Sequence, residues 1–113
     1  MKQGEIWLVR YDPSVGHEFK KDRPAVILSF ADILKYSNLV TVMAITSNLN
    51  DCLSNDIEII KDKTNNLYAD SVIKVYHLSS FDKQRFIKKI GEVDKTILAK
   101  IKSYLKKHFD IQL

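Results

Sequence analysis

Short runs of hydrophobic residues, separated by polar and turn-forming residues, fill most of the chain before its last helix-like segment. Five of these runs are rich in β-branched and aromatic residues and have the length of a strand. The predicted strands cover residues 5–11, 24–29, 39–46, 57–60 and 71–76. Asp12 and Pro13 end the first strand with a turn signal, and Pro24 opens the second where no ladder N–H is lost. Residues 31–36 are expected to form one or two helical turns.

The spacing of hydrophobic residues changes near the carboxyl end. After Asp94, which is placed to cap a helix, apolar residues recur every three or four positions with lysines between them. These apolar positions are Ile97, Leu98, Ile101, Tyr104 and Leu105. The pattern predicts one amphipathic helix at the end of the chain. Residues 85–93 fit either a helix or a strand, and we prefer a sixth strand because Gly91 weakens a helix.

Five or six short strands followed by a helix indicate a mainly β fold with helices (α+β). We expect a small antiparallel barrel packed against the C-terminal amphipathic helix. The chain has 113 residues, fewer than the ~150 of a typical domain, so we expect one domain over residues 1–113. A hydrophobic content of 45% suffices for one core.

The cysteine content and the amino-terminal residues indicate the cellular compartment of the protein. Cys52 is the one cysteine, so it has no partner for an internal disulfide, and a reducing compartment is expected. Glu5 interrupts the start where a signal peptide would be apolar, and no apolar run approaches the ~18 residues of a membrane span. We therefore expect a cytoplasmic protein with no membrane partner.

Several kinds of chemistry lack the residues they need. The three glycines are too far apart for a dinucleotide-binding turn or a P-loop, so no nucleotide cofactor is expected. His17 and Glu18 begin a pattern in which Lys21 stands where a zincin would have its second histidine. We expect neither a metal site nor any other cofactor.

The net charge of +4 favours an anionic partner and makes nucleic acid a candidate. Most of the excess lies in residues 83–113, which carry 9 basic and 3 acidic side chains. A solvated face of the last helix explains this excess better than a nucleic-acid site does. The functional hypothesis therefore depends on the loop between the first two strands.

That loop, residues 12–23, is near the length above which structureless loops are usually functional or disordered. Its chemistry-bearing side chains are His17, Glu18, Lys20, Lys21 and Arg23. A ribonuclease that works without metal needs a base, a cation and an acid, and the loop holds one of each. On composition alone, an ordinary polar surface loop is the commoner explanation.

Two further groups are candidates for RNA contact. Thr46, Ser47 and Asn48 end the third strand, where they bond a phosphate oxygen or, more commonly, cap the following turn. Lys74, Tyr76 and His77 end the fifth strand, where basic and aromatic side chains stack on and contact unpaired bases. The alternative for this second group is half-buried packing of the tyrosine and an ordinary surface histidine.

Taken together, the motifs resemble those of the MazF/PemK family of toxin endoribonucleases in order and spacing. The matching segments are residues 4–9, Asp12-Pro13, 15–18, 23–26 and 45–47, then Leu67, 70–72, Asp82-Lys83, Arg85, Gly91 and the final helix. They extend over nearly the whole chain, and the amino-terminal half is the more specific part.

The resemblance implies an SH3-like β-barrel, a homodimer, a cognate antitoxin, and metal-independent cleavage of single-stranded RNA at short sequences. It maps the central catalytic pair onto Arg23 and Thr46, and the family's His-Glu pair onto His17 and Glu18. Our chemical hypothesis is that Glu18 or His17 assists proton transfer. The 2′-hydroxyl would attack the adjacent phosphate, giving a 2′,3′-cyclic phosphate and a 5′-hydroxyl.

The chain departs from the family after the fifth strand. Many members have an Asp-Gln pair there, preceded in some by an arginine, whereas this chain has Lys74, Tyr76 and His77. Which group acts as acid and which as base therefore stays open. Two other functions are considered: a toxin of the same fold that binds and poisons DNA gyrase, and a plain module that binds RNA or peptide. The His-Glu and Arg-Pro arrangement favours the ribonuclease.

Overall fold

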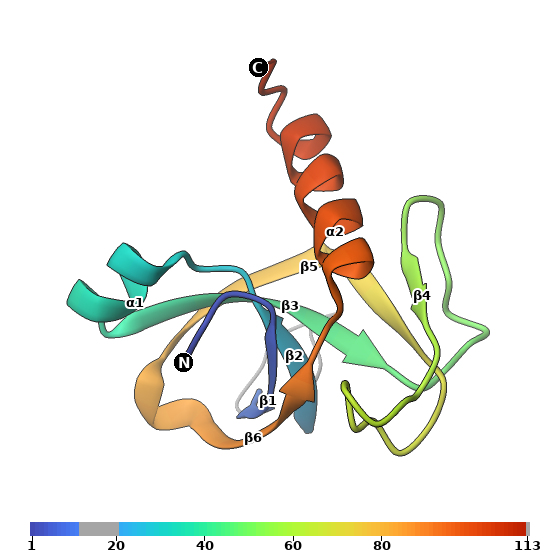
Figure 1. Ribbon diagram of the computed structural model, residues 1–113, viewed down its shortest axis with the longest axis horizontal. Coiled ribbons are helices and arrows are strands. Elements are labelled where there is room, and N and C mark those ends of the chain that lie inside the picture. The colour runs from blue at the N-terminus through green and yellow to red at the C-terminus, as the bar shows by residue number, and fades with distance from the viewer. Residues whose placement is uncertain (12–20, 113) are drawn as a thin grey trace.

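The computed structural model describes residues 1–11 and 21–112. Within these described residues, the chain forms six strands, two α-helices and one 3-10 turn (Figure 1). The strands are β1 (Glu5–Arg10), β2 (Asp22–Ile27), β3 (Leu39–Thr46), β4 (Ile57–Ile59), β5 (Ser71–Asp82) and β6 (Phe86–Glu92). The helices are α1 (Ala31–Tyr36) and α2 (Lys95–His108), and the 3-10 turn η1 spans Lys83–Arg85. The predicted sixth strand and both predicted helices are confirmed.

Strand β5 is longer than predicted. The prediction ended at Tyr76, whereas the strand runs on through His77, Ser79 and Ser80 to Asp82. The strand continues because β3 pairs with it again beyond an irregularity, from Met43 opposite Leu78 out to Leu39 opposite Asp82. Within this extension the hydroxyls of Thr41 and Ser80 are 2.7 Å apart, so a polar pair takes the place of hydrophobic contact.

All strand pairs are antiparallel, and the order across the sheet is β4-β5-β3-β2-β1-β6. The sheet curls into a half-barrel with α2 standing against it beside β4 (Figure 1). The expected fold class is therefore confirmed.

The segment that follows β4 crosses the opening of the curl to reach the far edge strand, β6. The amide of Glu92 donates to the carbonyl of Thr64 at 3.1 Å, and Asn66 Nδ2 donates to the carbonyl of Ile90 at 3.2 Å. Between these contacts lies Gly91, where an added Cβ would meet the carbonyl oxygen of Asn65 at 2.4 Å. Glycine is thus required here by close approach of two backbones.

Buried side chains form two clusters, one on each side of the sheet. Inside the curl, residues such as Ile6, Met43 and Ile73 pack with Ile101 and Tyr104 of α2. Outside it, Val9, Ile27 and Val42 pack beneath Leu34 of α1, together with the residues Tyr11 and Phe86.

Helix α2 begins at its predicted cap, since the Asp94 carboxylate accepts a hydrogen bond from the amide of Ile97 at 2.8 Å. Among the described residues, no helix is long and apolar enough to cross a membrane.

Candidate active site

Arg23 and Thr46 lie at the same end of adjacent strands. Ala25 of β2 pairs with Ala44 of β3, and each candidate residue lies two positions beyond this pair in the same direction. Side chains two apart on a strand share a face, so the antiparallel register brings the arginine and the threonine to one region of the sheet. The sequence resemblance named both residues, and the strand pairing supplies the reason that they meet.

A pocket of about 370 Å³ opens at this end of the sheet. Its walls come from β1, β2, β3, β6, the loop before β5 and the first residue of β5. The polar residues that line it are Asp22, Arg23, Ser47, Asn66, Tyr68, Ser71 and Lys88. Two cations, hydroxyl groups and an exposed aromatic ring are the groups that bind a phosphate chain with unpaired bases.

Tyr11 is an uncharged neighbour of Arg23. Its side chain is 4% exposed and its ring meets that of Phe81 edge-on, with centroids 4.8 Å apart. Burial raises the pKa of the Tyr11 phenol far above its ordinary value, and the nearby Arg23 cation opposes this rise only in part. Tyr11 therefore stays protonated at physiological pH and is unsuited to act as a base.

The end of β3 forms a hydrogen-bonded turn. Thr46 Oγ1 accepts a hydrogen bond from the amide of Asn48 at 3.2 Å, and Asn48 Oδ1 accepts one from the amide of Asn50, also at 3.2 Å. The capping alternative for Thr46 and Asn48 is thus present in the structure. It is compatible with a phosphate contact, because a hydroxyl that accepts in the turn still carries a hydrogen to donate.

Ser47 is exposed and lines the pocket, where its hydroxyl is 3.2 Å from the hydroxyl of Tyr68. Tyr68 and Lys88 are pocket residues that the sequence reasoning missed. The signal for Tyr68 was an aromatic residue in an otherwise polar loop, and it is 81% exposed. The sequence feature that could have indicated Lys88 was its position in the predicted sixth strand.

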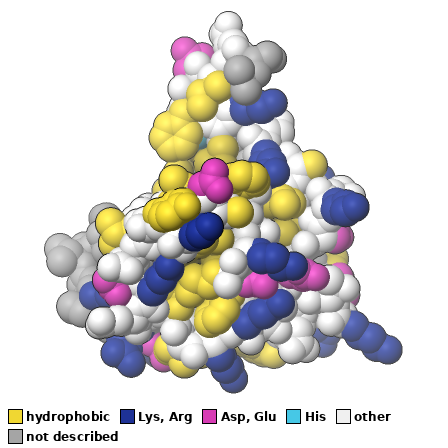
Figure 2. Space-filling view, turned by 60° about the vertical axis from the view of Figure 1, so that its left-hand side comes forward, with side chains coloured by type: hydrophobic (Ala, Val, Ile, Leu, Met, Phe, Trp, Pro, Cys, Tyr) yellow, Lys and Arg dark blue, Asp and Glu magenta, His cyan; other side chains and the backbone are white. Residues whose placement is uncertain are grey.

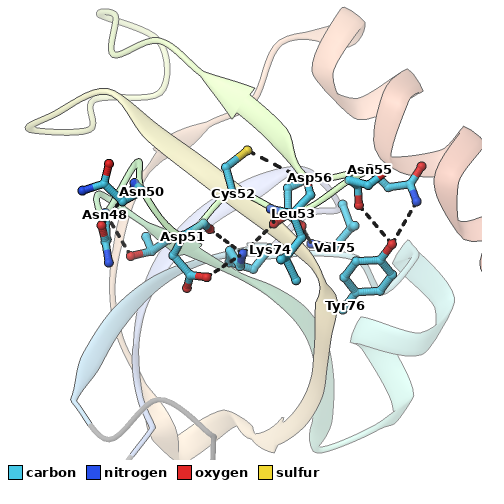
Figure 3. A network of polar contacts seen from close by, with 12 residues as sticks. Asn48, Asn50, Asp51, Cys52, Leu53, Asn55, Asp56, Lys74, Val75 and Tyr76 are labelled. Carbon is cyan, nitrogen blue, oxygen red and sulfur yellow. Dashed lines mark hydrogen bonds and ion pairs between the residues drawn. The ribbon is translucent and has the colours of Figure 1, made fainter.

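The predicted base contact of Lys74 is wrong. Its side chain is 1% exposed and its ammonium group is 2.5 Å from Asp56 Oδ2, with Asp51 Oδ1 at 3.5 Å (Figure 3). Residues 71–75 of β5 are all buried, and the loop that precedes β4 covers Lys74 through Asp51 and Asp56.

Tyr76 is 46% exposed, and its hydroxyl donates to the carbonyl of Ser54 and accepts from Asn55 Nδ2 (Figure 3). Its ring meets that of Tyr104 of α2 edge-on, with centroids 5.8 Å apart. The packing alternative for this tyrosine is thus visible. Base stacking by the exposed part of the ring, and base contact by the half-buried His77, stay predictions.

Three predicted loop residues, His17, Glu18 and Lys20, lie outside the described residues. Lys21 is described and exposed at the start of β2. Within residues 1–11 and 21–112, no group of three or more metal-ligating side chains is found.

A curled antiparallel sheet with a cationic, hydroxyl-bearing pocket at one end has the features of a small protein that binds an anionic ligand. Comparison with known proteins identifies the family. A family model described as a PemK-like, MazF-like toxin of type II toxin-antitoxin systems matches residues 2–109. The chain belongs to this family.

Relatives of known name agree with the assignment. The chain is 30% identical to Endoribonuclease MazF9 of Mycobacterium tuberculosis over 116 residues, which cover 98% of both chains. It is 35% identical to Endoribonuclease MazF of Staphylococcus saprophyticus over 91 residues, covering 80% of this chain and 75% of the relative. These names give no support to the gyrase alternative.

Solved structures share the fold. MazF from Deinococcus radiodurans superposes with a TM-score of 0.83 at 21% identity, covering 98% of this chain and 97% of the other. Toxin MazF-mt6 of Mycobacterium tuberculosis gives 0.76 at 20% identity, covering 96% and 99%.

Proposed function

We propose that this chain is the toxin of a type II toxin-antitoxin system and cuts single-stranded RNA as a metal-independent endoribonuclease. The observation that carries the proposal is the position of Arg23 and Thr46 at the same end of paired strands, beside the pocket. Family membership and relatives named as endoribonucleases support it.

The reaction is a transesterification that leaves a 2′,3′-cyclic phosphate on the upstream fragment and releases the downstream fragment with a 5′-hydroxyl. The ribose 2′-oxygen attacks the adjacent phosphorus as its proton passes to a base, and the bond to the 5′-oxygen breaks as that oxygen takes a proton from an acid. His17 and Glu18 are the candidates for these proton transfers. The guanidinium of Arg23 neutralises the charge that grows on the phosphorane, and Thr46 donates a hydrogen bond to a non-bridging oxygen.

The pocket supplies a path for the RNA strand. Lys88 and the exposed Lys21 provide charge for the phosphates, and Tyr68 provides a face on which a base stacks. Ser47 and Asn48, exposed after β3, provide hydrogen-bonding groups beside it.

We also propose two protein partners and a cytoplasmic site of action. An antitoxin is supported by the solved MazE-MazF complexes of Deinococcus radiodurans. A second copy of the chain is supported by the large hydrophobic side chains exposed on and beside α1, which are Phe30, Ile33, Tyr36 and Leu39. On the face drawn in Figure 2, hydrophobic side chains lie among scattered lysines and arginines.

Incubating the purified protein with single-stranded RNA in excess EDTA, then identifying the product ends, tests the function. We expect 2′,3′-cyclic phosphate and 5′-hydroxyl ends. Intact RNA over varied sequences, or cleavage that EDTA abolishes, would refute the proposal.

Variants with matched controls test the site. Arg23→Ala and Thr46→Ala should each lose about 100-fold or more in rate while staying folded. Arg10→Ala, an exposed arginine on β1, and Thr41→Ala, a hydroxyl elsewhere on β3, should cut like the parent. Equal activity of all four variants would show that the site is assigned to the wrong residues.

A further inference from the structure

The buried cation Lys74 lies under the loop that joins β3 to β4, outside the list of groups that the cleavage reaction uses. We propose that Lys74 is a positioning residue: its ion pair with Asp56 fixes this loop, residues 47–56, and through it the orientation of the Thr46 hydroxyl. The proposal rests on the proposed function, in which Thr46 contacts the scissile phosphate.

Lys74 joins two points of the loop to the middle of β5. Its Nζ donates to the carbonyl of Asp51 and to Asp56 Oδ2, both at 2.5 Å (Figure 3). The ammonium group is thus bonded at each half of the loop. A side chain that is 1% exposed holds this geometry without competition from solvent.

Asp56 is the second anchor, and its side chain is completely buried. Oδ2 accepts from the amide of Leu53 at 2.8 Å, and Oδ1 accepts from the amide of Val75 at 3.1 Å. One carboxylate therefore binds the loop, the lysine and the backbone of β5. Burial lowers the pKa of Lys74, but its hydrogen bonds to the Asp56 and Asp51 side chains and the charges of these carboxylates raise it by more, so the pKa lies above its ordinary value.

A continuous path of hydrogen bonds leads from this ion pair to Thr46. Lys74 bonds the carbonyl of Asp51, the amide of Asp51 bonds the carbonyl of Asn48 at 3.1 Å, and the amide of Asn48 bonds Thr46 Oγ1 at 3.2 Å. The last bond occupies a lone pair of the hydroxyl and so restricts the directions in which its hydrogen points. Shifting the loop would turn or release this hydroxyl.

A purely stabilising role explains the pair less well. Both flanking residues, Ile73 and Val75, are buried and apolar, so an apolar side chain at position 74 would avoid the cost of removing a charge from water. Buried ion pairs are often no more stabilising than apolar replacements, whereas their directional bonds select one arrangement. Here the selected arrangement is that of the loop that follows Thr46.

The test removes both charges together, because Lys74→Met alone would leave the buried Asp56 unpaired and would endanger folding. The variant Lys74→Met/Asp56→Asn is compared with the parent in single-turnover cleavage of one RNA that the parent cuts. We expect the rate at saturating RNA to fall about tenfold to a hundredfold, as for a small misplacement of a reacting group. The dissociation constant for an uncleavable 2′-deoxy analogue should change less than about threefold.

A double-mutant cycle shows whether the effect acts through Thr46. In the Thr46→Ala background, Lys74→Met/Asp56→Asn should cause no further loss of rate. The matched control is Lys89→Met/Glu5→Gln. It removes another ion pair, in which Lys89 Nζ of β6 is 3.1 Å from Glu5 Oε2 of β1. This control should alter the midpoint of unfolding while the cleavage rate stays that of the parent.

Amide hydrogen exchange gives a readout besides activity. The amide hydrogens of Asn48 and Asp51 should exchange faster in the Lys74→Met/Asp56→Asn variant than in the parent. The amide hydrogens bonded between β1 and β2 should exchange at the parent rate. A folded variant that cuts at the parent rate, or one whose loss is equal with and without Thr46, would overturn the positioning role alone. A parent that leaves RNA intact would instead overturn the proposed function, and the positioning role with it.

Discussion

Substituting alanine for Gly91 tests how the curled sheet is closed. The new Cβ would lie 2.4 Å from the carbonyl oxygen of Asn65 and 2.6 Å from that of Thr64. Both are backbone atoms, so the segment after β4 must move away from β6. Such crowding costs about 1–3 kcal/mol. The hydrogen bonds that join Thr64 to Glu92 and Asn66 to Ile90 are then weakened, at about 1 kcal/mol each.

An opposing effect comes from the unfolded chain. Replacing glycine by alanine in an unstrained backbone normally stabilises a protein by about 0.4–1 kcal/mol. The balance is a loss of about 2–5 kcal/mol, obtained from these ranges. In urea this lowers the unfolding midpoint by roughly 1–2 M for a small domain.

Equilibrium unfolding in urea, followed by circular dichroism, measures this loss. Asn66→Ala is the control, since it removes the side-chain bond to Ile90 without adding a clash. Alanine also tolerates the left-handed backbone of this position (φ 54°) less well than asparagine, so the loss should be about 1–2 kcal/mol. A Gly91→Ala variant as stable as the parent would show that the approach of the two backbones is not what closes the sheet.

Three further predictions concern other parts of the molecule. Asp94→Ala removes the cap of α2 and should lower the free energy of unfolding in urea by about 1 kcal/mol, whereas an equal effect from the neighbouring Lys95→Ala would contradict capping. Tyr68→Ala should weaken binding of an uncleavable RNA by about 1–3 kcal/mol and Tyr68→Phe much less, so equal losses would argue against stacking. Burial raises the pKa of Glu5, but hydrogen bonds from Trp7 and Lys89 outweigh this and leave it below its ordinary value of 4.5. The ionised Glu5 carboxylate therefore stabilises the fold above pH 4.5, and this stabilisation is lost as the pH falls through the lowered pKa. In Glu5→Gln, the free energy of unfolding should fall less steeply as the pH is lowered. An unchanged dependence of this free energy on pH would contradict the prediction.

Local signals in the sequence were sufficient for most elements. The strands of residues 39–46 and 57–59 and the Asp94 cap follow from alternation, β-branched residues and helix-capping chemistry, all of which act over a few neighbours. The polar end of β5 was missed because its pairing with β3 is a long-range contact that leaves little local trace.

The candidate site, too, could be predicted from the sequence only in part. Arg23 and Thr46 could be named because their motifs resemble those of a known family, while the register that brings them together needed the structure. Lys74 was misjudged because a lysine that alternates with the apolar Ile73 and Val75, shortly before Tyr76 and His77, resembles a residue on the exposed face of a strand. Only the buried carboxylate of Asp56, 18 positions earlier, accounts for its inward direction. Tyr68 and Lys88 join the pocket from separate segments for the same reason.

The crossing segment after β4 also affects how this molecule meets others. An unpaired strand edge is a template on which the strand of another chain can add, with aggregation as the result. At one margin of this sheet, β4 offers only Ile57–Ile59, and at the other the Thr64 and Asn66 contacts already occupy backbone groups of β6, which also carries Lys88 and Lys89. Extension of the sheet into a second chain is thereby discouraged, and association with other proteins is left to side-chain surfaces.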